Sequence, residues 1–285
     1  MSKAPPLFYQ GRQVAILTQH GKQELVRGPL EAALGCQLVH TDGYDTDQLG
    51  TFTRELTRAG SQLDAARKKA SIGMALTDTS VGMASEGSFG PDPFGAFMPW
   101  NTEVVLWVDR LSGIEVNGFA HGLAQSLHSM VKTPQELESF AKEAGFPEHR
   151  LVLRPEHPEH PDMVKGIHDH TLLLKAFHLA QAKSGNGVVF AENDLRAFCN
   201  PTRQKLILKA TEELIQKLLS ACPRCDSPGY WLSQQIPGLP CRACGSLTRL
   251  PQAEIWGCKK CSHQEQRAVN AQAWADPARC DFCNP

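Results

Sequence analysis

The chain has 285 residues, of which 41% are hydrophobic and 21% charged, and its 29 basic and 30 acidic side chains almost balance. A formal charge of -1 excludes a global basic field that would draw the protein onto nucleic acid or an anionic membrane. The first residues lack an apolar core of signal-peptide length, and no stretch reaches the roughly 18 apolar residues of a membrane span. We therefore expect a cytoplasmic protein without membrane contact.

The N-terminal third predicts a strand, a helix, a second strand and a second helix. The apolar run at residues 13–18 predicts a strand that ends in a turn, and helical apolar spacing follows to Leu34. A second strand is expected at 37–40, and the polar, glycine-containing stretch 41–60 is expected to be irregular. Ser61 is a suitable N-cap for a helix over 61–76.

The following segments continue this alternation. Residues 81–85 predict a strand, and the glycines and proline of 86–91 predict a loop after it. The remaining expected elements are a strand pair at 103–108 and 113–118, helices at 134–144, 171–181 and 201–219, and strands at 150–154 and 187–191. This order predicts an α/β or α+β domain with a mixed sheet over residues 1–220.

Four CxxC pairs lie within the last 64 residues, and they define a separate C-terminal module at residues 221–285. Two such pairs supply the four thiolates of a tetrahedral zinc site, so the module is interpreted as a double zinc ribbon with two structural ions. The predicted ligands are Cys222, Cys225, Cys241, Cys244, Cys258, Cys261, Cys280 and Cys283. The other two cysteines, Cys36 and Cys199, are expected to be buried thiols.

The spacing of the cysteines leaves their pairing open, because consecutive, nested and crossed arrangements all close two sites. The segment between the two inner pairs is compatible with a hairpin, which favours nesting. Residues 222–285 hold seven basic and five acidic side chains, and two tetrathiolate zinc centres of about -2 each make the module acidic. Strong nucleic-acid binding is therefore not expected, and a protein partner is the alternative.

Polar residues at the ends of two expected strands indicate a phosphate site. Thr18, His20 and Lys22 lie where a strand ends and a helix begins, so backbone N–H groups and an ammonium group converge there. Ser85, Glu86 and Ser88 follow another strand, at the edge of the sheet where ligands of α/β domains bind.

Three further groups of residues complete this candidate site. Asp45, Asp47 and Glu55 provide the hard oxygen ligands that suit Mg²⁺. Lys69, on the helix before the second strand, is placed to neutralise phosphoryl oxygens. Arg203 lies at the start of the last helix and offers a second anion contact. The alternative for Arg203, and likewise for Arg196, is an ion pair with Glu192, Asp194 or Glu213.

Two resemblances follow from these motifs. The strings DTDQLGTF, SEGSFGP and NPTR, with the CxxC tail, resemble an uncharacterised bacterial family known only as a domain of unknown function. More remotely, the first 120 residues resemble the nucleoside triphosphate pyrophosphatases of the inosine/xanthosine triphosphatase group, through the turn at Lys22, the helix at Lys69 and the acidic loop at Glu86. That resemblance implies phosphate binding by Lys22 and Lys69, with Mg²⁺ binding and orientation of the attacking water by Glu55 and Glu86.

The sequence thus predicts a Mg²⁺-dependent hydrolase of phosphoanhydride bonds in a nucleotide-like substrate, with Glu55, Glu86, Asp45 and Asp47 as catalytic residues. The alternative is a non-catalytic nucleotide sensor whose zinc ribbon docks a partner. A metal cluster of His157, His160, His168 and His170 is the alternative to an exposed loop, which the prolines of this region favour.

Overall fold

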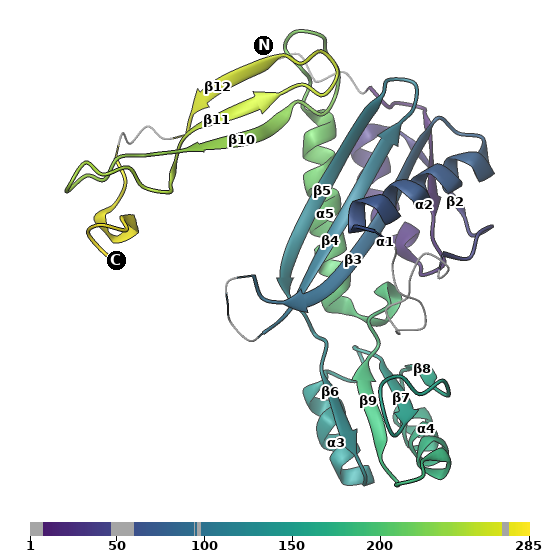
Figure 1. The fold of residues 1–285 in the computed structure, drawn as a ribbon. Helices are drawn as coiled ribbons and strands as arrows, with labels where there is room; N and C mark the ends of the chain where they lie inside the picture. The colour runs from purple at the N-terminus through teal and green to yellow at the C-terminus, as the bar shows by residue number, and fades with distance from the viewer. Residues whose placement is uncertain (1–7, 47–59, 94, 96–97, 270–273) are drawn as a thin grey trace.

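A computed structural model of the chain describes residues 8–46, 60–93, 95, 98–269 and 274–285. Its elements form three sheets along an elongated molecule, with a smaller sheet at one end and a β-ribbon projecting from the other (Figure 1). No helix in the described parts of the chain has the length and apolar character needed to cross a membrane.

The largest sheet has five strands in the order β2-β1-β3-β4-β5. Its strands are β1 (Gln13–Leu17), β2 (Gln37–Thr41), β3 (Val81–Pro91), β4 (Pro99–Asp109) and β5 (Ile114–Leu123). β1 is parallel to β2 and β3, while β3, β4 and β5 are antiparallel neighbours. The predicted mixed sheet of an α/β protein is therefore confirmed.

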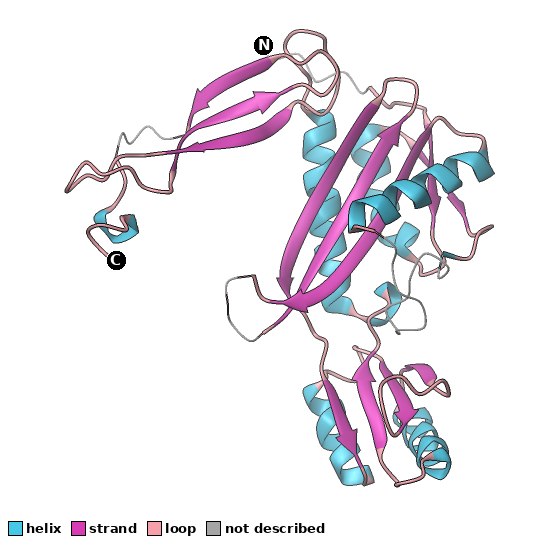
Figure 2. Cartoon of the chain, viewed as in Figure 1, coloured by secondary structure: helices cyan, strands magenta, loops and turns pink. Residues whose placement is uncertain are grey.

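Helices cover both faces of this sheet (Figure 2). On one face, α1 (Lys22–Leu34) and α5 (Pro201–Leu219) bury side chains such as Val26, Leu30, Ile207 and Leu214 against the strands. On the other face, α2 (Gln62–Thr77) packs small residues, among them Ala66 and Ala70, against β3 and β4. The capping box that Ser61 forms with Asp64 begins α2, as the sequence predicts.

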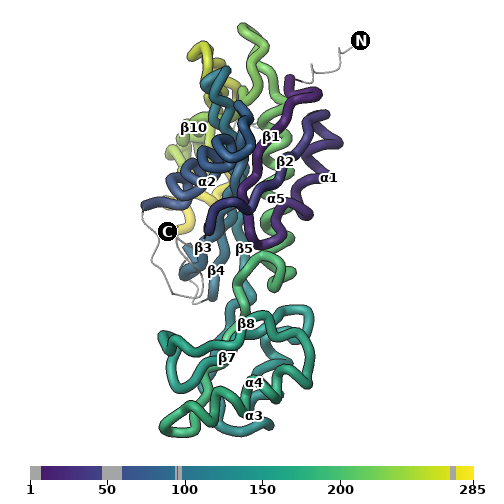
Figure 3. Tube along the Cα trace, turned by 90° about the vertical axis from the view of Figure 1, so that its right-hand side faces the viewer, coloured from purple at the N-terminus to yellow at the C-terminus, as the bar shows by residue number. Residues whose placement is uncertain are grey.

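A second sheet lies between β5 and α5 in the sequence and below the main sheet in space (Figure 3). Its strands run in the order β6-β9-β7-β8, with α3 and α4 contributing to the same core. These elements are β6 (His128–Val131), α3 (Pro134–Glu143), β7 (Leu151–Pro155), β8 (Val164–Ile167), α4 (His170–Lys183) and β9 (Val189–Asn193). The expected elements of this region form as predicted, but β6 and β8 have too few apolar residues to be recognised.

The C-terminal region forms an antiparallel sheet of β10 (Trp231–Pro237), β11 (Pro251–Gly257) and β12 (Gln264–Ala268). It follows α5 directly, and the backbone N–H of Tyr230 donates to the carbonyl of Ser220, one residue beyond the helix. Short 3-10 helices at Ala197–Cys199 (η2) and Pro277–Arg279 (η3) complete the described elements.

One element differs from its expectation in a way that positions the candidate site. The predicted loop at 86–91 is instead the second half of β3, which pairs with β4 as far as Pro91. Glycine fits in this strand because neighbouring side chains fill the space that a side chain at Gly87 would need. A Cβ at Gly87 would lie 2.2 Å from Glu103 Oε1. A local rule against glycine in strands therefore fails where cross-strand contacts decide the structure.

Candidate functional site

The candidate phosphate site lies where β1 ends and β3 continues. β1 pairs with Val81, Gly82 and Met83 of β3, so in the part of the chain that the structure describes no strand continues beside β3 beyond Met83 on this edge. The turn after β1 fills this position and begins α1, with Gly21 in the left-handed region at φ 66°. Residues 18–22 and 85–87, far apart in the sequence, therefore meet at one edge of the sheet.

Lys22 connects the two segments. Its ammonium donates to the backbone carbonyl oxygen of Ser85 at 2.5 Å, and only 6% of the residue is exposed. Burial and the charge of Arg203 together lower the pKa of Lys22 to about 7, against the opposing effect of Glu86 and Glu103. The amine thus titrates near neutral pH.

Two ion pairs flank Lys22 on opposite faces of the sheet. Glu86 lies on the α2 face, where the ammonium of Lys69 pairs with its carboxylate. Glu103 lies on the α5 face, where Nε of Arg203 donates to Oε1 at 2.7 Å with both side chains almost completely buried. The strand register explains why the two carboxylates lie on opposite faces. Glu103 is opposite Gly87 and Glu86 is opposite Val104, and successive side chains of a strand point to opposite faces of the sheet.

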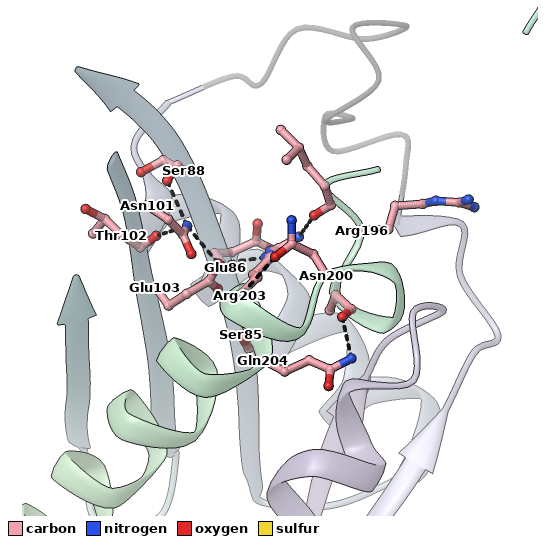
Figure 4. A network of polar contacts seen from close by, with 12 residues as sticks. Ser85, Glu86, Ser88, Asn101, Thr102, Glu103, Arg196, Asn200, Arg203 and Gln204 are labelled. Carbon is pink, nitrogen blue, oxygen red and sulfur yellow. Dashed lines mark hydrogen bonds and ion pairs between the residues drawn. The ribbon is translucent and has the colours of Figure 1, made fainter. Parts of the chain in front are cut away.

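Amide side chains extend the network around the Glu103–Arg203 pair (Figure 4). Asn101 donates to Glu103 Oε1 at 3.1 Å and to the Ser88 carbonyl at 3.0 Å. From α2, Gln62 donates to the carbonyls of Glu86 and Thr102. Three buried oxygen atoms of this network have no hydrogen-bond partner within the described parts of the chain, namely Ser85 Oγ, Asn101 Oδ1 and Glu103 Oε2, and such atoms normally have one.

The cluster of Lys22, Lys69, Glu86, Glu103 and Arg203, here called the polar cluster, holds three basic side chains against two carboxylates. Burial strengthens the field of these charges, because little water screens them. Arg203 also donates to the carbonyl of Leu195 at 2.6 Å, which fixes its position. With Lys22 protonated, the cluster therefore has one more positive charge than negative charges.

The other residues of the predicted site have mixed positions. Thr18 is buried, and its hydroxyl accepts a hydrogen bond from the backbone N–H of His20, whose ring stacks on Phe198. Ser88 donates to Gln62 at the margin of the network. Asp45 is exposed, although Thr46 beside it bonds to Gln19 of the first turn. Asp47 and Glu55 lie outside the described residues.

Glu103 and Asn101 are the members of the network that the sequence reasoning missed. Glu103 begins the apolar run of β4, and an acidic residue at such a position signals a buried partner. Arg196 pairs with Asp194, one of its three expected partners, whereas Arg203 pairs with Glu103.

The second candidate site is a pair of cysteine tetrads. In each tetrad the four Sγ atoms all lie within 4.8 Å of one another, and both tetrads could hold a metal ion. Their closest sulfur–sulfur distances are 3.7 Å for Cys222–Cys261 and Cys225–Cys258, and 3.8 and 3.7 Å for Cys241–Cys283 and Cys244–Cys280. A tetrahedron with metal–sulfur bonds of about 2.3 Å has edges of about 3.8 Å.

The tetrads are crossed, which corrects the expectation of nesting. The first contains Cys222, Cys225, Cys258 and Cys261, and the second contains Cys241, Cys244, Cys280 and Cys283. The reason is that β10 and β11 form the hairpin. β10 leads the chain away from the first CxxC pair to the second, and β11 returns the third CxxC pair to the first. The nested arrangement assumed a hairpin within residues 247–256, but β11 begins only at Pro251.

Each tetrad holds one thiol with a lowered pKa and one with a raised pKa, since the pKa of Cys261 and of Cys283 is raised to about 12, for Cys283 by its hydrogen bond with Cys244. Hydrogen bonds with Ser227 lower the pKa of the Cys225 thiol to about 6, and those with Ser246 do the same for Cys244. Thiolates are the form that binds metal. No further cluster of metal-ligating side chains occurs in the described residues, and the four histidines between 157 and 170 form none.

Comparison with known proteins identifies the family. The model for Domain of unknown function (DUF6671) matches residues 69–285, and the chain belongs to this family. The match includes Glu86, Glu103, Arg203 and all eight cysteines of the tetrads, while Lys22 precedes it. No curated protein matches the chain.

Proposed function

We propose that this member of the DUF6671 family binds a nucleotide-like ligand at the polar cluster, hydrolyses a phosphoanhydride bond in it with Mg²⁺, and holds two structural zinc ions in its C-terminal module. The observation that carries the proposal is the meeting of Lys22, Lys69 and Arg203 around two carboxylates at one sheet edge. Lys69 is the most accessible of the three, because 14% of its side chain is exposed.

The described carboxylates do not form a resident Mg²⁺ site. Glu86 already neutralises Lys69, and Glu103 neutralises Arg203. We therefore assign the magnesium to the substrate, as the ion that a triphosphate chelates. In this proposal the phosphate attracts Lys69, Lys22 and Arg203 stabilise the added negative charge, and the released Glu86 orients the attacking water.

The zinc assignment rests on the chemistry of the tetrads. Four sulfur ligands at tetrahedral spacing favour Zn²⁺, and complete thiolate coordination leaves no position for a substrate. Zinc therefore has a structural role in this proposal.

Replacing Glu86 with glutamine tests the catalytic role. We expect hydrolysis to fall by about 100-fold or more, since the variant loses the general base, while nucleotide binding remains. The measurement is phosphate and pyrophosphate release from a panel of nucleoside triphosphates with Mg²⁺. Glu115→Gln is the matched control, because Glu115 pairs with Arg67 on the exposed surface of the same sheet.

A nucleotide sensor is the second candidate, and the ion pairs of Glu86 and Glu103 favour it, because neither carboxylate faces a substrate alone. Nucleotide binding by the wild-type protein with no turnover of any triphosphate would select the sensor. Equal turnover by wild type and Glu86→Gln would reject the role of Glu86.

The low pKa of Lys22 predicts proton uptake when an anion binds. Near pH 7 part of the Lys22 population is neutral, and a bound phosphate raises its pKa because it favours the charged form. Affinity for tripolyphosphate should be greatest below pH 7 and fall by up to about tenfold per pH unit above it. Lys22→Arg keeps the positive charge at every pH, so the pH dependence of its tripolyphosphate affinity should be smaller. Titration of tripolyphosphate itself affects both proteins equally and does not contribute to the difference. Identical pH profiles would remove Lys22 from the site.

A further inference from the structure

Phe198 is 37% exposed, although the residues before and after it, Ala197 and Cys199, are buried. It belongs to η2, just before α5. A Cβ added at Gly21 would be 3.8 Å from the Cβ of Phe198, which places the ring against the turn that carries Lys22.

Flat nitrogen-bearing groups surround this ring. The His20 ring stacks on it, with centroids 6.1 Å apart and planes inclined by 29°. The guanidinium carbons of Arg196 and Arg150 lie 4.8 and 5.5 Å from the Phe198 centroid. An exposed aromatic ring among cationic and aromatic neighbours has the composition of a stacking surface for nucleobases.

The guanidinium group of Arg196 and the backbone of Arg150 are held in place before any ligand binds. Arg196 donates from Nε to both carboxylate oxygens of Asp194 at 3.0 and 3.1 Å. Arg150 is held by its backbone, which donates to the Cys199 carbonyl and accepts from the Asp194 N–H. A surface of this kind loses little conformational freedom when it binds a flat ligand.

We infer that Phe198, with His20, Arg150 and Arg196, is the stacking site for the base of the bound nucleotide. This inference rests on the proposed function, because it assigns the phosphates to the polar cluster. The two sites share their chain segments: His20 is two residues from Lys22, and Phe198 is five residues from Arg203. Stacking accepts any base, so the site selects nucleotides over inorganic phosphates without strong preference among bases.

The test compares binding of ATP and of inorganic tripolyphosphate, each with Mg²⁺, by isothermal titration calorimetry. Phe198→Leu keeps an apolar side chain and removes the π face, so we expect about tenfold weaker ATP binding and unchanged tripolyphosphate binding. Phe198→Trp should restore the ATP affinity. His20→Leu, a second variant away from η2, should weaken ATP binding selectively as well. Phe282→Leu is the control, since this exposed ring lies in the C-terminal module.

The outcomes separate this inference from the proposed function. If wild-type protein binds tripolyphosphate as tightly as ATP, or if Phe198→Leu weakens both equally, the stacking site is wrong and the anion site stands. If neither ligand binds, both fail. Urea denaturation of Phe198→Leu shows whether the variant remains folded, and His20→Leu provides the decision if it does not.

Discussion

Removal of zinc is expected to unfold residues 222–285 while the sheets before them remain folded. The module has little apolar core of its own: among its described residues the buried cluster consists of Tyr230, Cys222 and Cys258. Structural zinc contributes about 10–16 kcal/mol of binding free energy in small zinc domains, so no other interaction in the module can replace it. Native mass spectrometry should find two zinc ions per chain, and hydrogen exchange after chelation should show loss of protection in β10 to β12 and retention in β1 to β5.

Paired substitutions test how the ligands are shared. Cys222→Ser with Cys258→Ser removes ligands from one tetrad of the crossed arrangement, so this double variant should keep one zinc ion. Nested and consecutive arrangements place these two cysteines in different sites, and both ions would be lost. Cys36→Ser is the control, because Cys36 is a buried thiol of the main sheet and should leave the zinc content at two. A loss of both ions in the double variant would contradict the crossed arrangement.

The sequence was sufficient for local features of the fold. Periodicity located α5 with its observed bounds and α1, α2, β1 and β2 within a residue or so, because their apolar residues face one core. The spacing of the cysteines could not decide which CxxC pairs share a tetrad, since every pairing of them supplies four thiolates to each site. Only the path of β10 and β11 decides between them.

The candidate site was predictable in part for a similar reason. The membership of Lys22, Lys69 and Glu86 in the candidate site could be predicted from their positions at the ends of strands and on a helix. The role of Glu103 depends on its register opposite Gly87 and on the approach of α5 from a hundred residues away in the chain. Long-range pairing of this kind leaves no local periodicity in the sequence.

Replacing Arg203 with methionine is expected to lower the free energy of unfolding by about 3–5 kcal/mol, because it leaves the buried carboxylate of Glu103 without its cation. Arg203 and Glu103 have side chains that are 1% and 0% exposed. The double variant Arg203→Met with Glu103→Leu should recover much of this loss, since it also removes the stranded charge. Urea denaturation of the four proteins in this cycle measures the coupling.

Arg67→Met is the control against which the loss of stability in Arg203→Met is compared. Arg67 pairs with Glu115 across exposed surface, where the side chains are 44% and 38% accessible, so its loss should cost less than about 1 kcal/mol. If Arg203→Met were no more costly than Arg67→Met, the Glu103–Arg203 pair would not be the rigid part of the site. If the double variant recovers stability but binds no tripolyphosphate, the pair has a binding role beyond folding. The pair joins β4 to the first turn of α5, so its rupture also displaces Asn200 and the η2 segment that carries Phe198.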